Sequence, residues 1–231
     1  MNYSFDHGEI MDTERTECIR CGDCCRAGSP TLHISDVGLV KTDRIPLRDL
    51  YTIRIGEPVY DNLNGRIVPV SVEMIKIKER RHGGGCVFLD ETDQRCLIYE
   101  YRPCQCSAMK CWDDNEFKLR YGEPRGSRWD LVEDERMLAL MEEHERRTGY
   151  GHLKESVKAI QSLGETAVEE VLNEIRFDHH IRLFAGQKLG TSALEMDFYF
   201  GRPLSETIEV FGLQVRRQMD GTFLLTTADR S

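Results

Sequence analysis

The chain lacks both a strongly basic region and a long apolar segment. Lys and Arg total 31 against 40 for Asp and Glu, which gives a formal net charge of −9. We therefore expect no nucleic-acid partner, because no basic face is available to gather phosphates. No stretch approaches the roughly 20 apolar residues of a membrane span, so we expect no membrane partner. Residues 1–9 are polar and acidic, unlike an export signal, and this predicts a cytoplasmic protein.

Several catalytic and binding signatures are also missing. No His-x3–5-His element accompanies the cysteines, as a zinc finger would require. The glycine loop 83–85 has neither a P-loop lysine nor the G-x-G-x-x-G spacing, so we interpret it as room for the backbone beside Cys86. No nucleophile signature surrounds any thiol or any of the seven histidines, which leaves a catalytic Cys–His pair open but unsupported.

Cysteine, in contrast, is abundant and confined to one half of the chain. All nine cysteines precede residue 112. An odd number of thiols in a reducing compartment favours metal or redox chemistry over a disulfide framework. We place a boundary in the stretch Gly122-Glu-Pro-Arg-Gly126. This predicts a cysteine-cluster metal-binding domain over 1–124 and a mainly helical region over 125–231.

The apolar pattern of the first part predicts a small, irregular antiparallel sheet in an α+β fold. Asn64-Gly65 between two apolar runs is its strongest hairpin signal. The glycine loop and further turn signals separate short segments that are rich in β-branched and aromatic residues. These segments are 49–55, 66–70, 72–77, 86–89 and 95–99.

The second part changes to helical periodicity. Ser127 and Asp130 form a capping-box pattern before a helix that we expect to end near Gly149. Further helices are predicted over 153–163 and from Glu165. A short helix capped by Ser205 and a C-terminal hairpin that turns at residues 220–221 complete the chain.

The octapeptide CIRCGDCC, which begins at Cys18, carries four thiols. A C-x2-C step lets two thiolates converge on one metal, and here the step occurs twice, at Cys18, Cys21 and Cys24. Gly22 can supply the positive φ that such a turn often needs. The run resembles that of bacterial ferredoxins, except that Cys25 follows immediately in place of x3-C-P. Because sequence neighbours usually point apart, we expect Cys24 and Cys25 to face different sides.

The later cysteines complete a resemblance to a known family. The blocks Gly85-Cys86-Val-Phe-Leu89 and Cys96-Leu-Ile-Tyr99-Glu-Tyr-Arg102-Pro103-x2-Cys106 follow the octapeptide in order. Over roughly residues 18–112 the chain resembles the bacterial cysteine-cluster family with the C-x2-C-x2-C-C motif, described as zinc- or iron-chelating. The family has no firmly shared biochemical activity.

The resemblance implies a set of metal ligands, taken position by position. Cys111 fits members that have a further cysteine after the Arg-Pro block. Cys104 occupies a variable position, and Ser107 stands where many members have Arg. The implied ligands are Cys18, Cys21, Cys24, Cys25, Cys86, Cys96 and Cys106, with Cys111 as the eighth.

The thiols leave the metal and the number of sites open. Eight ligands suit two four-ligand sites, or one cluster and a reactive pair. Three spaced ligands with a remote fourth favour an iron–sulfur cluster, most simply 4Fe-4S. A motif relative, the flagellin lysine methylases, is thought to carry a four-iron cluster. Zinc is the alternative, and loosely held redox-active thiols are the third.

Our hypothesis divides the thiols between two sites. The first would contain Cys18, Cys21 and Cys24, with Cys96 or Cys106 as the fourth ligand. The second would contain or be lined by Cys25, Cys86 and Cys111.

The remaining charged and aromatic residues carry weaker signals. Arg102 would either offset thiolate charge or pair with a carboxylate. His82 and the basic run 76–82 are interpreted as solvated, with a ligand role for His82 as the alternative. His179-His180 lies in a helical pattern and favours a core or surface role. His144 and His152 form no inward Glu-x-x-His pattern, and the glutamates at 142–145 are expected to be solvated.

Two functions from different classes follow. One is an iron–sulfur protein with a redox or enzyme-accessory role, whose helical region binds a protein partner or substrate. The other is a zinc-stabilised binding module without redox chemistry, in which the metal only maintains the fold. Whether the protein is an enzyme stays open at this point.

Overall fold

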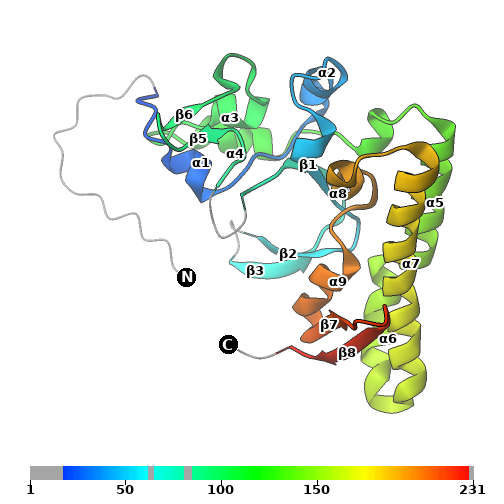
Figure 1. Ribbon diagram of the computed structural model, residues 1–231. Helices are drawn as coiled ribbons and strands as arrows, with labels where there is room; N and C mark the ends of the chain where they lie inside the picture. Colours follow the sequence, from blue (N-terminus) through cyan, green and yellow to red (C-terminus); the bar gives the residue numbers. More distant parts are fainter. Residues whose placement is uncertain (1–17, 62–64, 81–84, 229–231) are drawn as a thin grey trace.

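The computed structural model describes residues 18–61, 65–80 and 85–228. It is an α+β structure in which a cysteine-bearing part of short elements lies beside a helical part (Figure 1). The short helices of the cysteine-bearing part are α1 (Asp23–Ala27), α2 (Val37–Lys41), α3 (Cys104–Ala108) and α4 (Asn115–Tyr121).

The first part contains small antiparallel sheets, as expected, but they are three separate strand pairs rather than one sheet. Strand β1 (Leu50–Ile53) pairs with β4 (Met74–Ile77). The segment that connects them in sequence forms the hairpin of β2 (Pro58–Asp61) and β3 (Arg66–Pro69). The hairpin signal is therefore confirmed at Gly65, which has φ 65°, whereas Asn64 lies outside the described residues. Strand β2 was not predicted because Pro58 marks a turn in sequence, but proline is tolerated on an edge strand.

The strands expected over 86–89 and 95–99 are much shorter in the structure. Only β5 (Leu89–Asp90) and β6 (Arg95–Cys96) form a ladder. The N–H of Leu89 donates to the carbonyl of Cys86 at 3.0 Å, which closes a turn where a strand was expected. The region around Cys86 and Cys96 is thus built mainly from turns.

The helical part contains α5 (Glu135–Thr148), α6 (Tyr150–Leu163) and α7 (Glu165–Leu189). The Ser127–Asp130 capping box is present, but it caps a 3-10 turn, and Asp134 is the N-cap of α5. Helix α8 (Met196–Phe200) was not predicted. Among the described helices, none is long and apolar enough to cross a membrane.

The C-terminal segment follows the predicted order with one error. Pro203, rather than Ser205, is the N-cap of α9 (Leu204–Thr207). Proline fits here because its fixed φ suits entry into a helix and it needs no N–H partner. Strands β7 (Leu213–Arg217) and β8 (Phe223–Thr227) then form the predicted hairpin.

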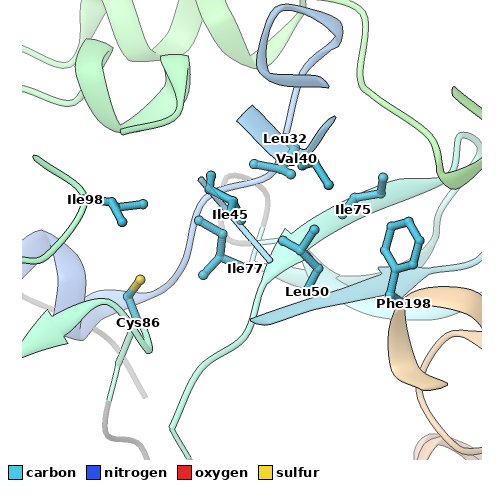
Figure 2. Close-up of a cluster of buried hydrophobic side chains, with 9 residues drawn as sticks. All are labelled: Leu32, Val40, Ile45, Leu50, Ile75, Ile77, Cys86, Ile98 and Phe198. Carbon is cyan, nitrogen blue, oxygen red and sulfur yellow. The ribbon is translucent and has the colours of Figure 1, made fainter. Parts of the chain in front are cut away.

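One buried cluster joins the two parts of the chain. Figure 2 shows Cys86 at one end of this cluster and Phe198 of α8 at the other. The side chains between them include Leu50, Ile75 and Ile77 from the β1–β4 pair. The hydroxyl of Thr52 also donates to the carbonyl of Phe198 at 2.6 Å. The thiol-bearing region is therefore anchored on a core to which the helical part contributes.

Buried charges cross the predicted boundary as well. Arg54, fully buried, lies 3.2 Å from His144 Nδ1 and 3.3 Å from Glu145. Arg128 pairs with Glu73 at 3.0 Å and with Glu145. The expectation that the glutamates at 142–145 are solvated is therefore wrong at Glu145, because this face of α5 meets two buried arginines. The boundary near residue 124 stays a prediction.

Candidate metal centre

The loop that carries the first thiols has the backbone of a tight turn. Arg20 and Gly22 both have positive φ, 59° and 78°. The turn brings the N–H of Arg20 to 3.4 Å from Cys18 Sγ, and Arg26 donates to the carbonyl of Cys21 at 2.9 Å. The role expected for Gly22 is therefore confirmed, because the left-handed region suits glycine.

The doubled cysteine faces one direction. Cys24 Sγ and Cys25 Sγ lie 3.9 Å apart, so the expectation that they face different sides is wrong. Adjacent residues of a helix project about 100° apart, but on the short α1 the two sulfurs still come within hydrogen-bonding range. The hydrogen bond with Cys25 lowers the pKa of Cys24 to about 6. The same hydrogen bond is the main cause that raises the pKa of Cys25, and burial raises this pKa further.

Gly85 allows Cys86 to lie directly against α1. The N–H of Cys86 donates to the carbonyl of Cys25 at 2.8 Å. Gly85 has φ 70°, and a Cβ there would lie 2.5 Å from the Cys25 carbonyl oxygen and 2.7 Å from Arg26 Cα. The interpretation of the glycine loop as room for the backbone is thus confirmed at Gly85, whereas residues 83 and 84 lie outside the described part.

The downstream thiols reach the same neighbourhood. Burial raises the pKa of Cys106, and the negative charges of Cys86, Cys96 and Cys24 raise it further. Burial also raises the pKa of Cys96, with Cys24 and Cys18 acting in the same direction. Thiols that shift one another in this way lie within electrostatic range. We refer to this group as the thiol cluster: Cys18, Cys24, Cys25, Cys86, Cys96 and Cys106.

Two of the expected ligands, and the ninth cysteine, have other surroundings. For Cys21, the N–H of Asp23 favours the thiolate, but burial and the charges of Asp23 and Cys111 raise its pKa overall. Cys111 is exposed. Cys104 Sγ lies 3.3 Å from Asp36, whose other oxygen accepts from the Cys104 N–H at 2.9 Å. Cys104 therefore faces a carboxylate, an arrangement that no sequence signal indicated.

Two arginines enclose Tyr99 next to the thiol cluster. The guanidinium carbons of Arg102 and Arg20 lie 3.9 Å and 5.0 Å from the centre of the Tyr99 ring. These contacts join the first cysteine loop to the Arg-Pro block. The charge of Arg102 also opposes the upward pKa shifts of Cys96 and Cys106. This favours the interpretation in which Arg102 offsets thiolate charge.

None of the described histidines adds a ligand to the thiol cluster, and His82 lies outside the described residues. His179 packs edge-on against Phe223 at 5.5 Å, and His152 bonds Glu174 at 2.8 Å. Within the described ranges, no three His, Cys, Asp or Glu side chains already form a group that could hold a metal ion. Metal binding at the thiol cluster would therefore require deprotonation and closer approach of the sulfurs.

Comparison with known proteins gives a match for this part of the chain. Residues 17–123 match a family model described as "CxxCxxCC: Putative zinc- or iron-chelating domain". No curated protein and no solved structure matches the chain. The match covers all nine cysteines and supports metal binding. Residues 17–123, the part of the chain that carries every cysteine, are therefore similar to the CxxCxxCC family, and this similarity supports metal binding.

Proposed function

We propose that the thiol cluster holds an iron–sulfur cluster, in the simplest case 4Fe-4S, and that the protein has a cytoplasmic redox or enzyme-accessory role. The observation that carries this proposal is the approach of six thiols from four separated segments. A cubane cluster needs four thiolates. The thiol cluster therefore offers enough ligands for one such group, and Cys21 and Cys111 are not needed to complete it.

The surroundings of the thiols suit a negatively charged cofactor. Arg102 opposes the build-up of negative charge at Cys96 and Cys106. Cys86 is buried at the end of the apolar cluster in Figure 2. Burial and nearby charge are two of the factors that set the potential of an iron–sulfur cluster. A bound cluster would supply one-electron chemistry, and the protein would supply its ligands, charge balance and partial exclusion of water.

A zinc-stabilised module is the second candidate, and the shortness of the thiol-bearing elements favours it. Helix α1 has five residues, and β5 and β6 have two each. Elements of this length are unstable alone. A structural zinc would supply folding free energy through the same thiols.

The helical region supplies a surface for the proposed protein partner. Leu183 and Phe184 are adjacent on α7, and 47% and 48% of their surfaces are exposed. Exposed neighbouring apolar side chains are more common at interaction sites than elsewhere on a surface. We propose this part of α7 as the contact for the accessory role.

Anaerobic purification separates the two candidates. Iron and acid-labile sulfide in equal amounts, with a brown colour and broad visible absorption, are expected for the iron–sulfur protein. A colourless protein that contains zinc and no sulfide would refute that proposal and support the structural zinc.

Two cysteines of α3 provide a matched pair of variants. Cys106→Ser should lose most of the bound metal, because Cys106 belongs to the thiol cluster. Cys104→Ser should retain it, because Cys104 faces Asp36. Both replacements change one sulfur to oxygen on the same short helix, and metal content per chain is the measurement. Loss of metal from Cys104→Ser together with retention in Cys106→Ser would contradict the assignment.

A further inference from the structure

A groove of about 680 Å³ lies on the outer face of the β1–β4 pair. Along the two strands the side chains alternate. Leu50, Ile75 and Ile77 face the buried cluster, whereas Tyr51 and Met74 line the groove. Alternation along a strand places the two sets on opposite faces. The groove is therefore separate from the core, and no cysteine lines it.

Three other elements close the groove. Val59 and Val68 belong to the β2–β3 hairpin, Phe117 and Tyr121 to α4, and Thr207 to α9. Figure 1 shows the hairpin lying between β1 and α9. The volume lies within the range of about 300–1,000 Å³ that is typical of small-molecule sites. Such sites combine apolar walls with placed polar groups, and here apolar and polar side chains line the groove in similar proportion.

Arg125 is the polar group that distinguishes this groove. Its guanidinium lies 4.9 Å from the centre of the Tyr121 ring, bonds Met74 Sδ, and donates to the Tyr121 carbonyl at 3.4 Å. Among the described residues, no carboxylate forms an ion pair with Arg125. A guanidinium has five N–H donors, and the bonds to Met74 Sδ and to the Tyr121 carbonyl use two of them. The remaining donors suit a planar carboxylate.

The other charges of the groove have partners or are exposed. Lys76 Nζ lies 3.6 Å from Glu79, and Arg202 pairs with the buried Glu57. Asp61 lies opposite Arg66 in the hairpin ladder, and Glu206 is exposed at the surface of α9. Arg125 is thus the charge that a ligand would satisfy.

We propose that this groove binds a small organic acid with an aromatic body. The carboxylate would pair with Arg125, and the ring would lie among Tyr51, Tyr60 and Phe117, which line the groove. Burial of the ring against these side chains would supply most of the affinity. The carboxylate would supply selectivity over neutral ligands of the same shape. This site is additional to the proposed metal function and does not depend on the identity of the metal.

The test compares 1-naphthoate with 1-naphthamide, which have the same ring system and differ in charge. Binding to the full-length, metal-loaded protein would be measured by ligand-observed NMR titration. A hydrogen bond to a charged group contributes about 1.5–3 kcal/mol. We therefore expect 1-naphthoate to bind roughly tenfold or more tightly than 1-naphthamide.

Three variants sharpen the comparison. Arg125→Gln should remove the preference for the acid, whereas Lys118→Gln, an exposed cation of α4 paired with Asp114, should leave it unchanged. Tyr60→Ala removes a ring that is 58% exposed, so it should fold normally, weaken both ligands and retain the preference. Equal binding of the two ligands, binding of neither, a preference that survives in Arg125→Gln, or unchanged affinities in Tyr60→Ala would overturn the proposal.

Discussion

Replacement of His144 by Gln should flatten the dependence of protein stability on pH. His144 is fully buried, with Nδ1 3.2 Å from Arg54 Nη1 and Nε2 2.7 Å from Asp178 Oδ1. A guanidinium only donates hydrogen bonds, so Nδ1 must accept and Nε2 must carry the proton. Both bonds are satisfied by the neutral ring. Protonation would place an N–H against the N–H of Arg54.

The charges around the ring come from three elements. Arg54 follows β1, Glu145 lies on α5, and Asp178 and Arg182 lie on α7. Burial lowers the pKa of His144 to about 4, although the hydrogen bond with Asp178 opposes the shift. The unfolded chain would have the ordinary pKa of about 6.5, so it binds the proton more readily than the folded chain does. Stability is therefore present above about pH 6.5 and is lost as the pH falls toward the folded pKa.

The size of the effect follows from the two pKa values. Each unit of difference corresponds to about 1.4 kcal/mol. The full loss for one histidine is thus about 3 kcal/mol, and the part that falls between about pH 7 and pH 5 is about 2 kcal/mol. Other groups also titrate in this range, so the informative quantity is the difference between the native protein and His144→Gln.

Urea unfolding at these two pH values provides the measurement. Gln retains an acceptor for Arg54 and a donor for Asp178, but it does not titrate. We expect the free energy of unfolding to fall by about 2 kcal/mol less in His144→Gln than in the native protein. His152→Gln, which changes a largely exposed ring paired with Glu174, serves as the control for loss of a histidine. An unchanged slope in His144→Gln would refute the neutral tautomer and the pKa shift together.

Two further substitutions, each with a matched control, test the anchoring of the thiol region. Gly85→Ala should destabilise the protein by more than about 1 kcal/mol and reduce metal content, because its Cβ would clash with the backbone of Cys25. Gly38→Ala in α2, where the added Cβ meets nothing within 4 Å, should be neutral or stabilising. Thr52→Val should cost about 1–3 kcal/mol by leaving the buried Phe198 carbonyl without its 2.6 Å donor. Thr42→Val, which removes an exposed hydrogen bond to the Gly38 carbonyl, should change the free energy of unfolding by less than about 0.5 kcal/mol. Equal effects of the two glycine variants, or of the two threonine variants, would contradict these assignments.

The local elements of this fold could be predicted because their signals are local. Gly149 is the C-cap of α5 and Gly164 is the C-cap of α6, as the apolar periodicity and the glycines indicate. The 3-10 turn after Ser127 shows the limit of such reasoning. A capping box marks the start of a helical turn, but it does not determine whether the turn continues. Tertiary contacts decide this, and here Arg128 turns inward to Glu73.

The turn that carries the first cysteines was predictable from the sequence, whereas the arrangement of the thiols was not. The spacing of the cysteines and Gly22 was sufficient to identify the first turn. It did not show that Cys24 and Cys25 face the same side, because that depends on side-chain rotamers on α1. The partner of Cys104 was equally hidden, since Asp36 lies far from it in sequence. The buried His144 was missed because its neighbours on α5 are charged, and their partners come from other elements.

The placement of the thiols relative to the core explains how weak elements can form a defined site. The segments that carry Cys24, Cys96 and Cys106 are too short to be stable alone. The first of them is attached to the buried core. The Cys25 carbonyl binds the Cys86 N–H, and Cys86 ends a buried cluster that includes Phe198 of the helical part. The core therefore limits how far the thiols can separate before metal binds, which reduces the conformational entropy that binding must overcome. On this argument the helical region would contribute to metal affinity although it contains no cysteine.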